Sequence, residues 1–487
     1  MPKVAFRRAP PDGPHPVAVP VAEGTPPPSR FAAAAQAARF TGRAGQALLL
    51  HAPLPALLVG AGPGASPADW MRAGGTAAAH LPKGESEGAA HLVLDARGRS
   101  AAEAAAMAAG ALLRDWRFTR HRTRDVQPGL AQVTLLADDP AAARAAWERE
   151  AAAVQGCLLA RDLVSEPANH LSTRHFAARL EALAAHGIAV DIWGRRRLER
   201  AGLGGLLAVG RAAEGPPRLA ILRWRGTFDA PPVVLVGKGV VFDTGGISIK
   251  GAKGMHAMRA DMAGAAACAG AMLALALRRS PAPVTAVLPL AENATGADAY
   301  RPGDVLTLFG GRTVEILDTD AEGRLILADA LGFAAATYRP RAMIDLATLT
   351  GAIVTALGHH RAGLFGNDAA LMAAAAAAGE GVAEPLWPMP IGERHREDLR
   401  SDIADIRQCA PAGRGIPDAC HAAAFLSAFA GDVPWAHLDI AGVEERRAAD
   451  ALGPKGASGF GVRLLDALIA ARFEEPDHHA DAPRPSA

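Results

Sequence analysis

Two short segments of this chain concentrate side chains that can carry out chemistry. The first sets Lys238, Asp243 and Lys250 among glycines, directly after an apolar run. Glycine lets a backbone approach a ligand closely or adopt a positive φ. On its own the segment also fits an ordinary turn, with a solvated lysine and an aspartate that closes it. It contains no GxxxxGK[ST] phosphate-binding loop.

The second segment, Leu317–Leu325, carries three acids and one arginine. On its own it fits a charged surface turn, in which local ion pairs contribute about 0–1 kcal/mol. A further acid, Asp261, falls early in a helix expected over Met258–Arg278. Carboxylates held by an apolar strand and helix framework need cations, and oxygen ligands without cysteine or histidine suit Mg²⁺, Mn²⁺ or Zn²⁺. The carboxylates expected at strand or helix ends are Asp243, Asp261, Asp320 and Glu322.

The surrounding sequence alternates between apolar runs and helical stretches, and this pattern must position the two segments. It predicts a mixed, mostly parallel sheet covered by helices. Ligands of such sheets bind beyond the carboxyl ends of the strands, so the loops after the runs are the expected site. The runs are Val233–Val236, Val284–Leu290, Ala342–Leu346 and Ala436–Ile440.

The first part of the chain shows a second, shorter alternation of apolar runs and alanine-rich helical stretches. It is followed from Pro140 to Asp162 by sequence with few helix breakers, which predicts one long helix that ends near Pro167. We therefore expect an α/β protein with a smaller N-terminal α/β domain over residues 1–150, of which 1–30 form a Pro-rich tail. A connecting helix and linker over 151–170 would join it to a larger C-terminal α/β catalytic domain with a mixed central sheet over 171–487.

The composition argues against several functional classes. With 51 Lys+Arg and 50 Asp+Glu among 487 residues, no overall field draws the protein to nucleic acid or to anionic lipid. The four cysteines form no CxxC pair, which argues against a disulfide framework or a thiolate zinc site. The first residues lack the apolar stretch of a secretory signal, and the uncharged run Met262–Leu277 is shorter than the ~20 residues of a membrane span. We expect a cytoplasmic protein without a membrane segment.

The order of these motifs along the chain resembles that of the leucyl aminopeptidases, the cytosolic dinuclear metallopeptidases. The resemblance begins near Arg161–Val164, continues through Gly204–Gly210 and includes both chemistry-bearing segments. It covers roughly the C-terminal two-thirds of the chain, and the acidic motif with its arginine is highly specific. The remaining matching motifs are Asp345–Ala352, Trp435–Gly442 and Gly456–Arg463.

The resemblance implies a centre of two divalent metal ions, zinc or manganese, with magnesium or cobalt as alternatives. Two of its carboxylates, Asp243 and Glu322, would bridge the ions. Asp261 would complete the tighter site with a lysine, and Asp320 would belong to the more exchangeable site. The complete set of implied metal ligands is Lys238, Asp243, Asp261, Asp320 and Glu322.

Two further cations have catalytic roles by the same resemblance. Lys250 would stabilise an oxyanion, and Arg324 would hold a bicarbonate that acts as general base. With both ions bound and the ligating amine of Lys238 neutral, these two cations leave the site with a net positive charge. Such a site attracts an anion and stabilises the oxyanion of a tetrahedral intermediate.

The implied activity is a metal-dependent aminopeptidase that releases N-terminal residues from peptides, with a preference for leucine-like apolar residues. The resemblance also implies a homohexamer. Two alternatives remain: another dinuclear hydrolase, such as a phosphoesterase, and a secondary DNA-binding role, which the near-neutral charge does not favour. The residues that resemble the pocket for the first side chain are Met258, Thr348, Leu349 and Gly351.

The chain departs from the family pattern in two places. Asp318 stands where the family usually has asparagine. It either faces the cluster near Asp320 and adds negative charge, or it points away or pairs with a nearby arginine. The segment Arg414–Ala424 stands where the family tends to have a Gly-Gly pair followed by Ile-Thr-Ala-Ala. The second departure bears on the shape of the substrate pocket and on assembly.

Overall fold

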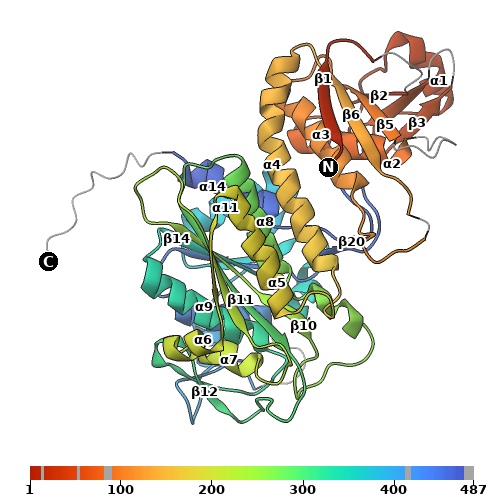
Figure 1. Ribbon diagram of the computed structural model, residues 1–487. Coiled ribbons are helices and arrows are strands. Elements are labelled where there is room, and N and C mark those ends of the chain that lie inside the picture. The colour runs from red at the N-terminus through yellow and green to blue at the C-terminus, as the bar shows by residue number, and fades with distance from the viewer. Residues whose placement is uncertain (12–15, 52–54, 82–89, 125, 412–417, 476–487) are drawn as a thin grey trace. The chain divides into compact units, whose positions relative to one another are not determined.

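The chain folds into two compact α/β units, which confirms the expected fold class (Figure 1). The computed structural model describes residues 1–11, 16–51, 55–81, 90–124, 126–411 and 418–475. The first unit is formed by Met1–Ser165 together with Gly381–Ala383 and Glu445–Gly459, and the second by the rest of the chain. No pattern in the sequence indicates that residues near position 450 pack with the first unit.

The first unit contains a sheet in the order β1-β6-β5-β2-β4-β3, in which only the β3 and β4 pair is antiparallel. Helices α2 and α3 each begin with a capping box, because the side chains of Ser66 and Ser100 accept a backbone N–H three residues on. The elements are β1 Lys3–Arg7, β2 Val17–Val21, α1 Ala32–Ala37, β3 Ala47–Leu50, β4 Ala56–Gly60, α2 Pro67–His80, β5 Ala90–Asp95, α3 Ala101–Asp115, β6 Leu130–Leu136, α4 Pro140–Ser165, β19 Glu445–Arg446 and β20 Gly456–Ala457.

The long helix predicted after Pro140 is present as α4, and it packs against α3 and β1 of the first unit. Its C-terminal residue, Ser165, is also the last residue of the first segment of that unit. That residues 151–170 act as the connector between two domains stays a prediction.

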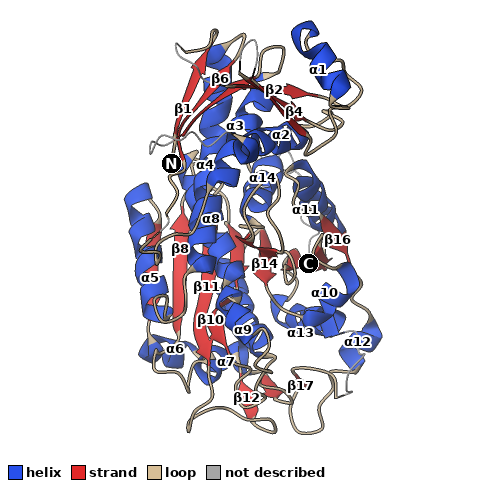
Figure 2. Ribbon diagram, turned by 90° about the vertical axis from the view of Figure 1, so that its right-hand side faces the viewer, coloured by secondary structure: helices blue, strands red, loops and turns tan. Residues whose placement is uncertain are grey.

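The second unit is built on a mixed sheet of nine strands, and Figure 2 shows several of them side by side with helices against them. Its order is β16-β15-β18-β14-β9-β11-β8-β7, and β10 also pairs with β11. Every predicted apolar run is a strand of this sheet. The strands are β7 Ala189–Trp193, β8 Arg218–Trp224, β9 Val233–Gly237, β10 Gly239–Asp243, β11 Val284–Asn293, β14 Ala342–Ala347, β15 Ala362–Gly366, β16 Leu386–Pro388 and β18 Trp435–Asp439.

Helices cover both faces of this sheet. Successive side chains of a strand point to opposite faces, so a single strand contacts helices on both sides. Val234 and Val236 of β9 pack with Leu325 of α9, in a core of buried aliphatic side chains. On the opposite face Gly237 lies so close to Ala265 of α8 that a Cβ would approach its Cα to 2.6 Å. Helix α13 packs on α9, and α14 packs on α8.

The remaining elements of the second unit surround this layered core. Two short strands, β12 Val305–Thr307 and β13 Thr313–Glu315, form a small sheet with β17 Ile406–Arg407. The helices are α5 Thr173–Glu181, α6 Arg195–Ala201, α7 Gly204–Val209, α8 Ala263–Leu277, α9 Glu322–Tyr338, α10 Gly351–Leu357, α11 Ala369–Gly381, α12 Glu393–Glu397, α13 Asp418–Ala430 and α14 Val462–Phe473.

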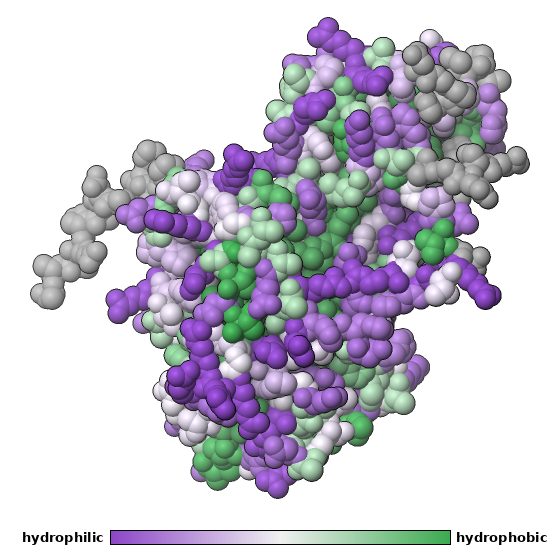
Figure 3. All heavy atoms as spheres, in the orientation of Figure 1, coloured by the Kyte–Doolittle hydropathy of each residue, from purple (hydrophilic) through white to green (hydrophobic). Residues whose placement is uncertain are grey.

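The apolar side chains lie mainly inside the units. The face drawn in Figure 3 is largely covered by hydrophilic residues, with hydrophobic residues scattered between them. Among the described residues one helical stretch, Met255–Leu277, is long and apolar enough to cross a membrane, but 94% of its most apolar window is buried inside the protein. This stretch is therefore a buried helical segment that packs on the central sheet, and it is only weak evidence for a membrane span.

Candidate metal centre

Five polar side chains close the ends of neighbouring strands in the second unit. Asp243, Asn293 and Asp439 are the last residues of β10, β11 and β18. Lys238 and Thr348 directly follow β9 and β14. Because these strands run parallel to one another, their carboxyl ends meet at one edge of the sheet. This is the edge at which the sequence predicted the chemistry.

The acidic segment reaches the same edge through a buried threonine. Thr319 lies in the turn before α9, and its Oγ1 accepts a hydrogen bond from Ser248 N at 2.8 Å. The same hydroxyl donates to Gly245 O at 2.7 Å. Gly245 has φ 86°, a conformation that glycine adopts without strain. These bonds tie the two chemistry-bearing segments together although about 70 residues separate them along the chain.

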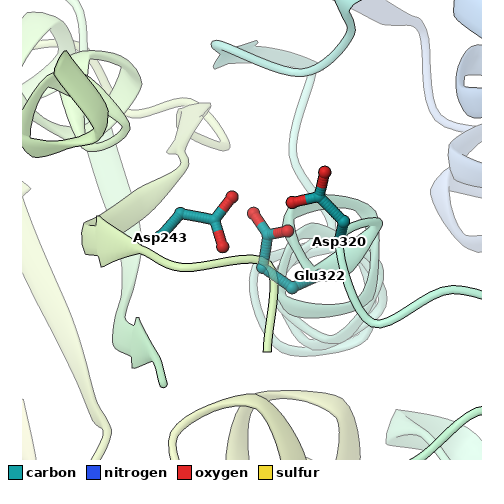
Figure 4. A group of neighbouring side chains, drawn as sticks. All are labelled: Asp243, Asp320 and Glu322. Atoms are coloured by element: carbon teal, nitrogen blue, oxygen red, sulfur yellow. The ribbon is translucent and has the colours of Figure 1, made fainter. Parts of the chain in front are cut away.

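Three carboxylates meet where these segments join. Asp243 comes from the end of β10, Asp320 from the turn before α9, and Glu322 is the first residue of α9. Their nearest carboxylate oxygens lie within 4.8 Å of one another (Figure 4). Like charges at this separation repel strongly, so the arrangement requires cations between or beside them.

Two lysines connect the carboxylates. Lys238 Nζ lies 2.7 Å from Asp261 Oδ1 and 2.8 Å from Glu322 Oε1, and thereby brings Asp261 into the cluster. Lys250 Nζ lies 2.9 Å from Asp243 Oδ2 and also contacts Asp320 Oδ1. The structure thus brings together all the residues that the sequence singled out as metal ligands, with Lys250 beside them.

The side chain of Lys238 passes close to Gly323, next to Glu322 at the start of α9. A Cβ at Gly323 would lie 2.6 Å from Cε of Lys238. Lys238 Nζ also donates to the backbone oxygen of Thr348 at 3.0 Å, and the hydroxyl of Thr348 donates to Asp261 Oδ1 at 2.7 Å. The ammonium is therefore held in one orientation by groups from three separate segments of the chain.

Burial and mutual repulsion shift the ionisation of the cluster. Burial raises the pKa of Asp320 to about 7, in spite of the nearby Lys250 ammonium. Burial also raises the pKa of Asp261 and of Glu322, and the other carboxylates add to the effect. Burial alone would lower the pKa of Lys238, but Asp261, Glu322 and Asp243 raise it above its ordinary value. Each shift reflects a concentration of negative charge in a space that excludes water.

The partners of the buried carboxylate oxygens indicate whether the site suits metal ions. Among the described residues, the buried oxygen Asp261 Oδ2 has no hydrogen-bonding partner, and Glu322 Oε1 and Asp320 Oδ1 meet only the two lysine ammonium groups. Buried carboxylate oxygens are rarely left in this state, and hard divalent cations take oxygen ligands of this kind. The donor set therefore fits a divalent metal centre.

Arg324 follows the carboxylates in the first turn of α9 and is almost fully buried. Its Nη1 donates to the backbone oxygen of Gln408 at 3.0 Å, and its Nη2 donates to Asp418 Oδ1 at 2.9 Å. Sequence reasoning noted the segment that contains Asp418 only as a departure from the family, and it missed Gln408. No local pattern marks either residue, since both lie more than 80 positions from Arg324.

Gln408 holds the acidic segment in place. Its Oε1 accepts hydrogen bonds from Leu317 N at 2.7 Å and Asp318 N at 3.1 Å. Its Nε2 donates to Ala321 O at 3.2 Å. One buried amide therefore satisfies three backbone groups of the turn that presents Asp320.

The carboxylate of Asp318 binds the backbone of the next acid in the cluster. Asp318 Oδ1 accepts a hydrogen bond from Asp320 N at 2.9 Å, the arrangement of an Asx turn. An asparagine at this position could accept the same hydrogen bond through its own Oδ1. The departure from the family pattern therefore preserves the turn and changes its charge.

Asp261 differs from the expectation in its local structure. A single helix was predicted over Met258–Arg278, but the stretch divides into a 3₁₀ helix, Met255–Ala260, and α8. Asp261 N donates to Met258 O at 3.3 Å, an i to i−3 bond that tightens the turn. Asp261 therefore sits at the junction of two helices, and α8 begins after it.

The residues predicted to form the substrate pocket lie near this junction and at the end of β14. Met258 belongs to the 3₁₀ helix, and Thr348 contacts both Lys238 and Asp261. Leu349 N donates to Asp439 Oδ1 at 3.1 Å, and Gly351 begins α10. Thr348 thus touches the cluster directly, while the role of the four residues as a pocket stays a prediction.

Comparison with known proteins gives a consistent result. Residues 158–466 match the catalytic domain of the cytosol aminopeptidase family, and residues 29–125 match the N-terminal domain of the same family. A probable cytosol aminopeptidase of Methylorubrum populi is 43% identical over 91% of this chain and 90% of its own length. One from Agrobacterium fabrum is 44% identical over 84% of this chain and 82% of its own length.

Solved structures also resemble the chain closely. The bottromycin maturation enzyme BotP in complex with Mn has a TM-score of 0.85 at 36% identity, covering 94% of this chain and 99% of its own. A mutant of tomato leucine aminopeptidase has a TM-score of 0.86 at 30% identity, covering 97% of each chain. The two matched domains, the relatives and the carboxylate cluster agree: this chain belongs to the cytosol aminopeptidase family and is a metallo-exopeptidase.

Proposed function

We propose that this protein removes N-terminal residues from peptides by hydrolysis at a centre of two divalent metal ions. One observation carries the proposal: three carboxylates from two distant segments converge within 4.8 Å, beside two lysines. The fourth carboxylate, Asp261, keeps a buried oxygen without a partner among the described residues. Family membership supports peptide substrates.

Five side chains would hold the metal ions. We propose Asp243 and Glu322 as the bridging ligands, and Asp320 as a ligand of the more exchangeable ion. Asp261 and Lys238 would be the other ligands of the tighter ion, and Lys238 would have to give up its ammonium proton when that ion binds. When bound, such ions supply an activated water and polarise the scissile carbonyl. Zinc and manganese are our first candidates, and the similar structure of BotP in complex with Mn supports the second. Magnesium and cobalt remain alternatives.

Lys250 is proposed as the cation that stabilises the developing oxyanion. Its side chain is 24% exposed and that of Lys238 only 4%, so Lys250 can reach a substrate while Lys238 stays within the cluster. The position of its ammonium beside both Asp243 and Asp320 puts a permanent positive charge at the edge of the centre. A preorganised cation at this place stabilises negative charge more in the transition state than in the ground state.

Arg324 is proposed as the cation that fixes an anionic group near the reacting atoms. The resemblance implies bicarbonate as this anion and as the general base. Arg324 already donates hydrogen bonds to Asp418 and to the backbone of Gln408. Bicarbonate therefore stays a prediction.

We propose a preference for leucine-like apolar N-terminal residues. Met258 and Leu349 would supply apolar surface, and Thr348 and Gly351 would shape the pocket that receives the first side chain. The similarity to a leucine aminopeptidase of tomato supports this preference. We also propose that the protein works in the cytoplasm and assembles as a homohexamer, as the resemblance implies; equilibrium sedimentation of the purified chain would test the assembly.

The activity is tested by metal removal and restoration. Purified protein should hydrolyse leucine amide, lose this activity after chelation and exhaustive dialysis, and regain it when manganese or zinc is added back. N-acetylated leucine amide should not be hydrolysed, because acetylation removes the free α-amine by which an exopeptidase recognises its substrate. Equal cleavage of the acetylated compound would disprove an aminopeptidase.

The alternative functions have separate tests. A dinuclear phosphoesterase would hydrolyse p-nitrophenyl phosphate with the same metal dependence and would leave leucine amide intact. A DNA-binding role would appear as salt-dependent binding that survives the loss of the metal ligands. With a net charge of +1 the chain offers no general attraction for DNA, so we do not expect nucleic acid as a partner.

A further inference from the structure

Asp439, the last residue of β18, is a fully buried carboxylate that is not among the proposed metal ligands. Its Oδ1 accepts a hydrogen bond from Leu349 N at 3.1 Å, and its Oδ2 accepts one from the hydroxyl of Thr350 at 2.7 Å. Ala441 N also donates to Oδ1, at 3.2 Å. A carboxylate at this depth needs such partners, and two of the three come from the loop that follows β14.

The pairing of two parallel strands brings Asp439 to this loop. Asp439 pairs with Ala347, the last residue of β14, so the loop begins directly beyond the pair. A second buried carboxylate, Asp345, lies two positions earlier in β14, 2.6 Å from His437 Nδ1 and 2.7 Å from Trp435 Nε1. Burial raises the pKa of Asp439, while His437 and the hydrogen bonds from the loop oppose the rise.

The loop that Asp439 holds contacts two of the proposed metal ligands. Thr348 O accepts a hydrogen bond from Lys238 Nζ at 3.0 Å, and the hydroxyl of Thr348 donates to Asp261 Oδ1 at 2.7 Å. Lys238 and Asp261 are the two residues that we assign to the tighter ion alone. Thr348 therefore lies between the buried carboxylate of Asp439 and both of these ligands.

A single peptide group connects Asp439 to Lys238. The N–H of Leu349, which Asp439 accepts, and the C=O of Thr348, which Lys238 contacts, belong to the same peptide unit. This unit is planar, and in the usual trans form its N–H and C=O point in opposite directions. Fixing the N–H toward Asp439 therefore fixes the C=O toward Lys238.

The direction of this carbonyl matters for metal binding. A lysine that ligates a metal ion has given up one proton and keeps two N–H donors. If Thr348 O accepts one of them, the amine can turn its lone pair only in a restricted direction. Groups that orient metal ligands in this way commonly contribute to affinity although they do not touch the ion.

We propose that Asp439 is a positioning residue of the metal centre. Through the peptide between Thr348 and Leu349 it orients Lys238 and Asp261, and it thereby raises the affinity for the ion that these two residues share. The hydroxyl of Thr350 secures the far side of the loop, because it also accepts Ile353 N at the start of α10. This inference rests on the metal centre of the proposed function.

The test titrates full-length, metal-free protein with Mn²⁺ and measures the dissociation constants of both ions by calorimetry. Asp439→Ala should weaken the tighter ion by about 10–100-fold, the usual effect of losing a group that orients metal ligands. Asp439→Asn keeps an oxygen that can accept both N–H groups, so its affinity should stay close to that of wild type. Asp439→Leu fills the space without an acceptor, and it serves if the alanine variant does not fold.

Asp345→Asn is the matched control, because Asp345 is equally buried and its partners lie on β18. It should bind Mn²⁺ as wild type does, even where urea denaturation shows a loss of stability. The affinity for the more exchangeable ion should change little in the alanine variant, so the gap between the two dissociation constants should narrow. A role in folding alone would lower stability and leave this gap unchanged.

Two results would overturn the proposal: a folded alanine or leucine variant that binds the tighter ion as wild type does, or an equal loss of affinity in Asp345→Asn. Binding is measured without substrate, so the two proposals can fail separately. Wild-type protein that binds two ions and leaves leucine amide intact would refute the peptidase activity, while the titrations would still decide whether Asp439 positions the ligands.

Discussion

Lys238 and Lys250 have the same chemistry but different surroundings, and this difference separates their proposed roles. Lys238 is enclosed by Asp261, Glu322 and the backbone of Thr348, whereas Lys250 is partly exposed at the edge of the cluster. The two lysines can therefore have different roles. Lys238 would be a metal ligand, and Lys250 would be a cation that faces the substrate, because Lys250 is the more exposed of the two.

Lys250→Ala should lower kcat by about 10²–10³-fold and change KM much less, because an oxyanion-stabilising charge acts mainly in the transition state. Steady-state kinetics on leucine amide at saturating metal measures both constants. Lys253→Ala is the matched control, since Lys253 is exposed in the same loop. An unchanged kcat in the Lys250 variant would remove this residue from the mechanism.

Glu322→Gln should reduce the bound metal from two ions per chain to one or none, because an amide is a poor bridge between two cations. Metal analysis after dialysis gives the stoichiometry, and hydrolysis should fall below detection in parallel. Asp298→Asn, a change to an exposed acid outside the cluster, should retain both ions. Two tightly held ions in the Glu322 variant would contradict the bridging role.

At the scale of elements, the site depends on the turn between β13 and α9. Gln408 holds this turn through three backbone hydrogen bonds, and it comes from the segment after β17. A turn held from outside its own sequence can present Asp320 and Glu322 in a fixed geometry, which local propensity alone does not provide.

Gln408→Ala should lower the free energy of unfolding by about 1–3 kcal/mol, since it leaves buried N–H groups of the turn without an acceptor. Urea denaturation of the metal-free protein measures this loss apart from metal binding. We further expect weaker metal retention, because the turn would no longer hold Asp320 in place. Retention and stability equal to those of wild type would show that the turn is ordered by other contacts.

Asp329 joins α9 to two neighbouring segments through a buried carboxylate. Its two oxygens accept hydrogen bonds from Leu206 N and Phe309 N, each at 2.8 Å. Burial raises the pKa of Asp329 to about 7 from an ordinary value of 3.8. The folded state therefore binds a proton that the unfolded state releases between these two pH values, and this contribution to stability is lost as the pH rises through about 7.

We expect the unfolding free energy of wild type to fall between about pH 4 and 7 relative to that of Asp329→Asn, which cannot titrate. Denaturation curves across this range for both proteins give the difference. A difference that is independent of pH would show that the carboxylate is equally ionised in both states. The variant should keep its peptidase activity at pH values where it is folded, because Asp329 lies about two turns beyond Glu322 in α9.

At the scale of the whole molecule, the metal centre is expected to contribute to stability as well as to catalysis. The carboxylates that repel one another come from β10, the junction between the 3₁₀ helix and α8, and the start of α9, so cations among them link the layers of the larger unit. A ligand that binds only the folded state stabilises it by about 2.7 kcal/mol at a hundred times its dissociation constant.

Chelation should therefore lower the thermal unfolding midpoint by several degrees, and adding back the metal should restore it. Differential scanning calorimetry measures the shift. Glu322→Gln protein should show little response to the same treatment, because its ligand set is incomplete. An identical midpoint for chelated and loaded wild type would show that the centre adds nothing to the stability of the fold.

The sequence alone determined the fold class, the strands that carry the site and the identity of the clustered side chains. Apolar runs of strand length and their spacing are local properties, so β9, β11, β14 and β18 could be predicted before any contact was known. The candidate ligands stood out because carboxylates, lysines and glycines were concentrated in two short segments with a family-like order. Their meeting at one sheet edge follows from the parallel strands.

Only the tertiary structure decided how these residues are held and which partners they have. Gln408 and Asp418 reach the site through the packing of α13 on α9 and through the small sheet that contains β17, contacts between segments more than 80 residues apart. The division of the helix at Asp261 and the packing of residues 445–459 with the first unit have the same origin. Hydrogen bonds and ion pairs between distant segments depend on three-dimensional proximity, and spacing along one sequence carries no record of it.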